Sequence, residues 1–279
     1  MPASLPTHDA QLSPDLIDRA KTGDREALER VLTAIAPMVR RFGMRMCQDA
    51  HDSEDVLQET LLDILLHLPS FEGRSSFSSW VFSLTRSRCT RRRRGQKNQP
   101  KMPLHELPEP QGVTPSPEDV MSVKVLGRTL DEALGRLSEE HREVLLLRDV
   151  ESLTAPEAAE ILGISVMALK SRLHRARAAL REALDPNLLR PTSSPGPSCP
   201  DIAELWSRKL DGELDALDCE HMERHLLSCP ACTEACAALK NALFLCRTHP
   251  VGDVSPEIQQ AVKSAVRIWL RGLEPAQGR

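Results

Sequence analysis

The sequence predicts an all-α protein, and three observations support this. Aromatic residues make up only 3% of the 279 residues and Tyr is absent, so residues that favour strands are scarce. Ala, Leu, Glu and Arg, which favour helices, are plentiful. Apolar residues recur at three- and four-residue spacing in several segments between proline-rich stretches. We therefore expect small helical domains joined by linkers.

Two proline-rich stretches, 95–117 and 185–198, are the expected linkers. They divide the chain into three predicted domains, 12–94, 118–184 and 199–273. No stretch reaches the roughly 20 apolar residues that span a bilayer, and the N-terminus lacks a basic start followed by an apolar run. We expect a cytoplasmic protein that makes no membrane contact.

The net charge of -4 conceals two basic segments. Residues 71–101 contain nine Lys or Arg and one Glu, and residues 166–182 contain five Lys or Arg and one Glu. Two basic patches on an otherwise acidic chain indicate a polyanionic partner that is contacted at two places.

The first domain is expected to contain a helix that Ser53 caps. Asp55, Glu59 and Asp63 follow one face at four-residue spacing, and such a row of like charges disfavours an isolated helix. Either a basic surface faces this row or water does. The opposite face carries an apolar stripe, predicted to be core: Val56, Leu57, Leu61, Ile64, Leu65 and Leu68.

Half of the eight aromatic residues lie in the next twelve residues, directly before a run of Arg. Aromatic rings stack on bases and guanidinium groups bind phosphates, so this composition suits single-stranded nucleic acid. The alternative is a set of core aromatics beside solvated Arg, and we expect Phe77 or Trp80 to be partly buried. The residues are Phe71, Phe77, Trp80 and Phe82, then Arg86, Arg88 and Arg91 to Arg94.

The second domain has the pattern of a helix-turn-helix. Thr154 and Glu157 can form a capping box, Pro156 falls in the first turn, Gly163 permits the tight turn, and Ser165 caps the second helix. A basic second helix suits the major groove of DNA, the alternative being a merely solvated basic helix. Its predicted apolar face is Leu169, Leu173, Ala176 and Leu180; its other faces carry Lys170, Arg172, His174, Arg175, Arg177 and Arg181.

The third domain holds six of the eight Cys, between 199 and 246. His225, Cys229 and Cys232 form H-x3-C-x2-C, with Pro230 placed to begin a helix. Zinc favours four N or S ligands, and Cys199 is the candidate for the fourth. The alternative is a set of buried Cys beside a surface His.

Three further cysteines of this domain, Cys219, Cys236 and Cys246, could form a second metal site or join the first. Disulfide-based redox sensing is the competing interpretation. An apolar stripe on the last helix is expected to dock on another domain or to pack within its own: Ile258, Val262, Ala265, Val266, Trp269 and Leu273.

Residues 52–95 and 137–182 resemble regions 2 and 4 of the ECF sigma factors. The resemblance implies that Asp52, Asp55, Gln58 and Glu59 contact core RNA polymerase. It implies that the minus-ten element is bound by Trp80, Arg86 and Arg88. For the minus-thirty-five element it implies groove contacts from Lys170, Ser171, His174 and Arg175, with phosphate contacts from Arg172 and Arg177. The chain reads Arg86-Ser87 where the family commonly has Arg-Asn, and it lacks the usual S-x-G-T-V turn.

Residues 199–232 resemble the zinc-binding fold of anti-sigma factors, and the whole layout resembles the metal-responsive CorE-like subgroup. The resemblance implies that zinc, or another thiophilic metal such as copper or cadmium, is held by Cys199, His225, Cys229 and Cys232.

The predicted function is a sigma factor that directs core RNA polymerase to promoter DNA and is regulated by metal, as a monomer within the holoenzyme. No small-molecule substrate or catalytic residue is expected, because no phosphate loop, nucleophile elbow or paired-carboxylate cleft is recognisable. Alternatives are a metal- or redox-responsive repressor that acts without polymerase, a sigma factor whose zinc is purely structural, and a module that sequesters another sigma factor through 199–273.

Overall fold

The structure is a computed structural model, and it describes residues 12–95, 129–184, 196–248 and 254–273. These residues form helices, turns and short irregular segments without any strand, which confirms the all-α prediction. None of the described helices is both long and apolar enough to cross a membrane. The chain divides into two compact units: residues 1–112 with 251–279, and residues 113–250.

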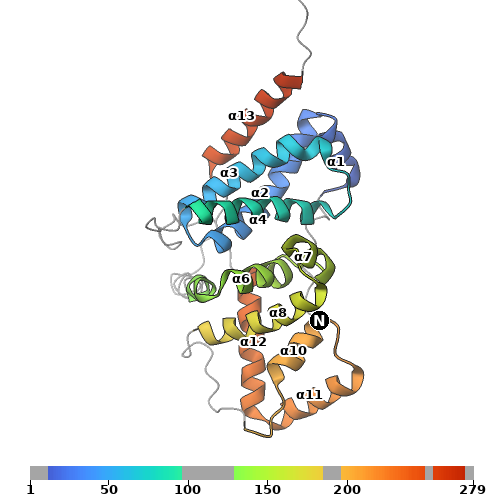
Figure 1. Ribbon diagram of the computed structural model, residues 1–279, viewed down its shortest axis with the longest axis vertical. Coiled ribbons are helices and arrows are strands. Elements are labelled where there is room, and N and C mark those ends of the chain that lie inside the picture. The colour runs from blue at the N-terminus through green and yellow to red at the C-terminus, as the bar shows by residue number, and fades with distance from the viewer. Residues whose placement is uncertain (1–11, 96–128, 185–195, 249–253, 274–279) are drawn as a thin grey trace, which may run out of the picture. The chain divides into compact units, whose positions relative to one another are not determined.

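In its described residues, the first unit contains helices α1 to α4 and helix α13 (Figure 1). Helix α2 packs against α1, α3 and α4, and α3 also packs against α4. The core residues come mainly from α2 and α3, where Leu28, Ile35, Phe42, Leu57 and Ile64 are fully buried. The elements are α1 (Pro14–Lys21), α2 (Arg25–Cys47), α3 (Ala50–His67), the short η2 (Leu68–Ser70), α4 (Phe77–Gly95) and α13 (Pro256–Leu273).

Helix α3 begins earlier than the sequence predicts. Its cap is Asp49, whose side chain accepts a hydrogen bond from the amide of Asp52, and Ser53 is a buried residue inside the first turn. The expected cap at Ser53 is therefore wrong, because an equally good capping side chain lies four residues upstream. The predicted apolar stripe is confirmed, since all six of its residues are buried.

The last helix packs against α2 and α3, far from it in the sequence. Ile258 and Val266 are buried, and they belong to the predicted apolar stripe. Of the two expected outcomes for this helix, docking on another part of the chain is the one observed. The division into three separate domains stays a prediction. In the structure, α13 belongs to a different unit from the cysteine-rich segment before it.

The second unit contains the helix-turn-helix and the cysteine-rich segment. Thr154 and Glu157 form the predicted capping box, Gly163 adopts a left-handed φ of 67°, and Ser165 caps the second helix. The predicted apolar face of that helix is fully buried. Residues 129–136 are helical. The elements that follow are α6 (Glu139–Leu145), the π-helical turn η4 (Leu146–Val150), α7 (Ala155–Leu162), α8 (Val166–Ala183), α10 (Ile202–Leu210), α11 (Ala216–Ser228) and α12 (Pro230–Thr248).

Three packing contacts connect the halves of the second unit. Helices α10 and α12 both contact α8, and α12 also contacts η4. A small apolar core of Ile202, Met222, Cys232 and Cys236 holds α10, α11 and α12 together. The cysteine-rich segment is therefore packed directly against the helix-turn-helix.

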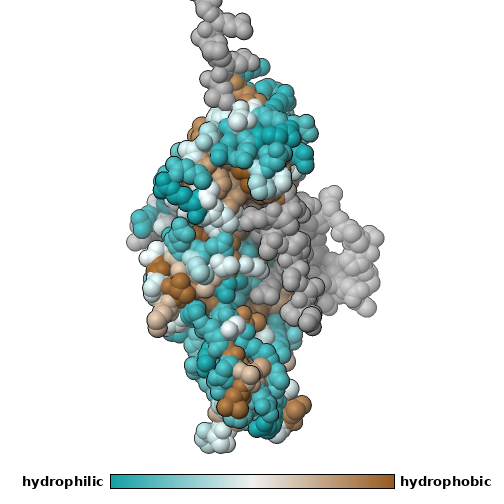
Figure 2. Space-filling view, turned by 90° about the vertical axis from the view of Figure 1, so that its right-hand side faces the viewer, coloured by the Kyte–Doolittle hydropathy of each residue, from teal (hydrophilic) through white to brown (hydrophobic). Residues whose placement is uncertain are grey.

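Apolar side chains reach the surface in small separate patches among hydrophilic ones (Figure 2). Among the described residues, Met167 is 82% exposed at the start of α8. Leu62 and Leu66 on α3 are 38% and 60% exposed. All three side chains lie on helices that carry predicted binding residues.

Candidate polymerase, nucleic-acid and metal sites

The acidic row on α3 is paired with arginines of α4. Arg92 donates to Asp52 at 3.0 Å, lies 3.6 Å from Glu59, and also pairs with Asp55. Arg88 donates to Glu59 at 3.1 Å. The basic surface that the sequence left open as one possibility is therefore supplied by the chain itself.

Arg88 also pairs with Asp63 through two guanidinium nitrogens. This hydrogen bonding raises the pKa of Arg88, although burial opposes the shift. Arg88 is only 23% exposed, so a predicted promoter contact is largely engaged within the protein. Gln58 is exposed on the same helix as Asp63, one turn before the exposed Leu62.

The four aromatic residues near the start of α4 divide into two pairs. Phe82 is fully buried and its ring centroid lies 5.5 Å from that of Phe42, so it belongs to the core. Phe77 is also buried, as the sequence analysis allowed, and contacts both Phe71 and Trp80. Phe71 and Trp80 are half-buried, with centroids 5.1 Å apart. The rings left available for stacking are therefore Phe71 and Trp80.

A pocket of about 430 Å³ opens beside this aromatic cluster. Its walls come from α1 and from the segment that leads into α4. They include the apolar Ile17, Phe71 and Phe77 and the charged Asp18 and Lys21. Apolar walls with a few polar groups are typical of small-molecule pockets.

Helix α8 presents part of its predicted DNA-binding set to solvent. Ser171 and Arg175 are exposed, and Lys170, Arg172 and His174 are half-buried. Arg172 lies 3.3 Å from Glu140 on α6. Burial lowers the pKa of the nearby His141, and the charges of Arg175 and Arg172 lower it further. The guanidinium charges of Arg172 and Arg175 therefore both act on the His141 ring, and Glu140 opposes them.

Arg177 is placed differently from the expectation of a phosphate contact. Its side chain is 2% exposed and makes hydrogen bonds of 2.7 and 2.8 Å to the two carboxylate oxygens of Asp149. Asp211, beyond α10, lies 3.2 Å away on the other side. In this arrangement Arg177 cannot reach a phosphate, because its donors face the protein interior. Its spacing from Leu173 and Leu180, four and three residues away, places it on the buried face of α8, but that spacing does not reveal the distant carboxylates that make burial of its charge favourable.

The structure brings the four predicted metal ligands together. The ligand atoms of Cys199, His225, Cys229 and Cys232 all lie within 4.8 Å of one another. Cys199 precedes α10, His225 lies in the last turn of α11, Cys229 follows that helix, and Cys232 lies in the first turn of α12. Pro230 begins α12 as predicted.

The geometry of this cluster fits zinc. Tetrahedral zinc with Zn–S bonds of about 2.3 Å places two sulfurs about 3.8 Å apart, and the Sγ atoms of Cys199 and Cys229 are 3.8 Å apart. The buried Nε2 of His225 has no hydrogen-bond partner among the described residues, as expected of a nitrogen that binds a metal. Burial and the neighbouring thiols raise the pKa of Cys232 to about 12. The Cys232 backbone amide lowers the pKa of Cys229.

Two further cysteines of this segment, Cys219 and Cys236, lie outside this cluster. Cys219 pairs with Glu223, which also binds Lys209 at 2.7 Å. Cys236 lies in the apolar core, where burial raises the pKa of its thiol. The side chain of Cys246 is outside the described residues.

Comparison with known proteins assigns the family. Residues 31–99 match the model of sigma-70 region 2, and residues 127–180 match the model of sigma-70 region 4. The chain is 31% identical over 176 residues to the ECF RNA polymerase sigma factor ShbA of Streptomyces griseus, covering 60% of this chain and 92% of the relative. The chain belongs to the ECF RNA polymerase sigma factors. This confirms the resemblance found in the sequence.

Other relatives of this sigma factor carry the same description. This chain is 28% identical over 178 residues to the ECF RNA polymerase sigma factor SigW of Bacillus subtilis. The alignment covers 60% of this chain and 94% of SigW. Among solved structures, it aligns with CnrH in complex with the cytosolic domain of CnrY at 23% identity and a TM-score of 0.45, covering 61% and 96% of the two chains. It aligns with the sigma factor RpoE in complex with the anti-sigma factor NepR from Bartonella quintana at 25% identity and a TM-score of 0.45, covering 56% and 94%.

The sigma factor also contains a zinc-finger-like segment. Residues 199–233 match a family model described as a zinc-finger, and this range contains all four residues of the Cys3His cluster. The family matches thus cover regions 2 and 4 and the cysteine-rich segment, in that order along the chain.

Sequence reasoning missed two features of these sites. One is the exposed apolar pair Leu62 and Leu66, whose four-residue spacing on the outer face of α3 was the available signal. The other is the contact between the cysteine-rich segment and α8, for which no local signal exists because the partners are more than 30 residues apart.

Proposed function

We propose that this sigma factor directs core RNA polymerase to promoters and that metal at the Cys3His cluster regulates it. The observation that carries the first part is the match of one chain to both region 2 and region 4, in the order and spacing of the family. The polymerase supplies the chemistry, so the sigma factor needs no catalytic residue of its own. Cytoplasmic location and a single copy in the holoenzyme follow from this role.

Helix α3 is the proposed contact with core polymerase, through Asp52, Asp55, Gln58 and Glu59. Arg88 and Arg92 hold the carboxylates in fixed positions, which reduces the side-chain entropy lost on binding. Exposed Gln58, Leu62 and Leu66 extend this surface with one polar and two apolar side chains. Such a mixed surface is typical of an interface centre with a polar rim.

The start of α4 is the proposed contact with the minus-ten element, through Trp80, Arg86 and Arg88. The half-buried ring of Trp80 can stack on an unpaired base, and the neighbouring pocket can accept a second one. Arg88 would exchange a carboxylate of Asp63 or Glu59 for a phosphate as the strand binds.

Helix α8 is the proposed reader of the minus-thirty-five element, through Lys170, Ser171, Arg172, His174 and Arg175. Ser171 and Arg175 are exposed, and the positive charges of Lys170, Arg172 and Arg175 favour phosphates. We do not assign a phosphate to Arg177, given its burial against Asp149.

Zinc is the proposed metal, held by Cys199, His225, Cys229 and Cys232. Through its four ligands, zinc would crosslink α11, α12 and the start of α10. It would not take part in catalysis, because a closed set of four protein ligands leaves no open coordination position. Copper or cadmium could compete for the same thiols, as in the CorE-like subgroup that the sequence resembles.

Run-off transcription with purified core enzyme tests this function. We expect transcripts that depend on the sigma factor and whose yield changes when zinc is removed by a chelator and restored by zinc. Unchanged yield at every zinc occupancy would leave the sigma function intact but make the zinc purely structural. A repressor that acts without polymerase is distinguished by gel filtration, because it would not comigrate with core enzyme.

A further inference from the structure

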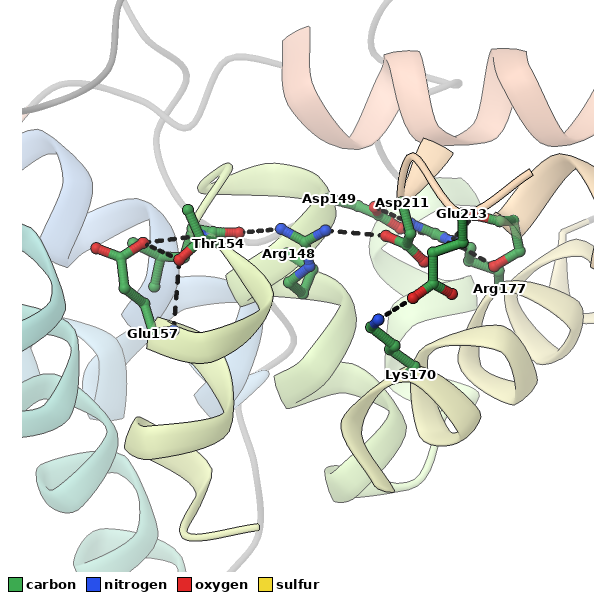
Figure 3. A network of polar contacts seen from close by, with 10 residues as sticks. Arg148, Asp149, Thr154, Glu157, Lys170, Arg177, Asp211 and Glu213 are labelled. Carbon is green, nitrogen blue, oxygen red and sulfur yellow. Dashed lines mark hydrogen bonds and ion pairs between the residues drawn. The ribbon is translucent and has the colours of Figure 1, made fainter. Parts of the chain in front are cut away.

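The strongest unexplained feature is a buried ion-pair network between α8 and the segment that follows α10 (Figure 3). Arg177 projects from α8 and binds Asp149 through two nitrogens at 2.7 and 2.8 Å. Its third nitrogen donates to the backbone oxygen of Ser207 at 3.2 Å, to the Ser207 hydroxyl, and to Asp211 at 3.2 Å. The helix-turn-helix therefore accepts only some of the hydrogen bonds that this guanidinium donates, and the cysteine-rich segment accepts the others.

Because these charged side chains are buried, their pairing strongly affects the stability of the second unit. The side chains of Arg177, Asp149 and Asp211 are 2%, 3% and 7% exposed. Charges removed from water in this way are costly unless every one is paired. Burial alone would lower the pKa of Arg177, but hydrogen bonds and charges from Asp149 and Asp211 more than offset it and raise the pKa. The network is closed only while α10 lies against α8.

Two further cations of the helix-turn-helix bind the same short segment. Arg148 donates to Asp211 at 2.9 Å, and Lys170 pairs with Glu213. Gly212, with a φ of 71°, turns the chain between these two carboxylates so that both face the helix-turn-helix. Two carboxylates from one turn thus hold three cations, and one of these, Lys170, lies in the proposed DNA-reading set.

We propose that the segment Ser207–Glu213 is an internal competitor of DNA for helix α8. The carboxylate of Glu213 occupies a position beside Lys170 that a DNA phosphate would otherwise take. Asp211 anchors the same segment by pairing with Arg148 and Arg177. This segment and a duplex therefore cannot both bind Lys170. The proposal rests on the proposed DNA-reading role of α8 and adds the regulation of that surface.

The metal cluster is positioned to control this competitor. Cys199 lies two residues before Asp201, the cap of α10, and the apolar core that contains Cys232 also contains Ile202 of α10. The ligands therefore fix the helix that carries Ser207 and presents Asp211. Loss of this crosslink would free α10 to leave α8.

The test uses the full-length chain with both carboxylates neutralised, Asp211→Asn with Glu213→Gln. The probe is a fluorescein-labelled 25-bp duplex of arbitrary sequence, and binding is followed by anisotropy from 50 to 200 mM NaCl. We expect the double variant to bind about five- to tenfold more tightly at 50 mM, with a salt dependence steeper by about one to two phosphate contacts. The matched control, Glu220→Gln, breaks an exposed ion pair with Arg224 on α11 and is expected to bind as the wild type does.

Two outcomes overturn the proposal, and they can be distinguished. If Arg175→Gln weakens duplex binding but the double variant equals the wild type, α8 reads DNA and nothing competes with it. If neither the wild type nor any variant binds the duplex, the DNA-reading role fails and the competitor falls with it. Folding is checked by circular dichroism, and it should be retained because Asp149 still pairs with Arg177. Glu213→Lys, a surface charge reversal that repels Lys170, should tighten binding as the double variant does.

Discussion

A guanidinium nitrogen of Arg88 lies 3.1 Å from a carboxylate oxygen of Glu59, which joins a residue proposed to bind promoter DNA to one proposed to bind polymerase. Arg92, one turn further along α4, makes the same kind of connection to Asp52 and Asp55. Because the two surfaces share ion pairs, a change in one is expected to alter the other. Mutations on α4 should therefore affect polymerase binding as well as DNA binding.

Arg92→Ala is expected to destabilise the first unit by ~1 to 3 kcal/mol, because Asp52, only 7% exposed, loses its ion-pair partner. The measurement is the thermal unfolding midpoint by calorimetry. Arg91→Ala on the same helix is the control, since Arg91 is exposed, and it should leave the midpoint unchanged. An equal effect of the two substitutions would mean that the ion pairs do not stabilise the fold.

Arg177→Ala is expected to destabilise the second unit by ~3 to 5 kcal/mol, because a carboxylate that is 3% exposed is left unpaired. The double variant Arg177→Met with Asp149→Leu should recover most of the stability, since it removes both charges together. Chemical denaturation followed by circular dichroism measures both. A single variant as stable as the wild type would show that Arg177 does not stabilise the second unit.

Cys229→Ser and Cys232→Ser are each expected to lose bound zinc, because the site depends on thiolate ligands. The measurement is metal content per chain by inductively coupled plasma mass spectrometry after dialysis. Cys219→Ser is the matched control, since Cys219 pairs with Glu223 outside the cluster, and it should retain zinc. Full zinc content in Cys229→Ser would reject that ligand.

Zinc affinity is expected to rise with pH between 6 and 8. Burial raises the pKa of Cys232 to about 12, so the metal-free protein holds a proton on this thiol throughout that range. Zinc binds the thiolate and displaces the proton. For each proton that is released on binding, the zinc affinity should therefore rise about tenfold per pH unit. Calorimetric titration in buffers of different ionisation enthalpy counts these protons. Binding without net proton release would contradict the expectation.

The elements that the sequence predicts well are those fixed by neighbouring residues. The Thr154 capping box, the Gly163 turn and the Ser165 cap depend on contacts within four residues, and the structure confirms all three. The structure also brings the four candidate metal ligands together, because H-x3-C-x2-C places three of them at one helix junction and Cys199 lies just before the amphipathic helix upstream; their binding of a metal stays a prediction.

The features that were not predictable depend on partners far away in the chain. Arg177 carries a charge, which favours a surface position, and only the carboxylate of Asp211, 34 residues later, together with Asp149 makes its burial favourable. The cap of α3 was misplaced because Asp49 and Ser53 are both good capping residues, and local preference does not choose between them.

Helix α13 covers part of α2 and α3, although it comes after the cysteine-rich segment in the chain. A deletion of everything beyond residue 198, the simplest way to remove the cysteine-rich segment, would also strip this helix and expose the apolar side chains beneath Val266. The phenotype of such a shortened protein would combine the loss of the cysteine-rich segment with the loss of α13. An internal deletion that keeps residues 256–273 is the cleaner genetic tool for assigning a phenotype to the metal cluster.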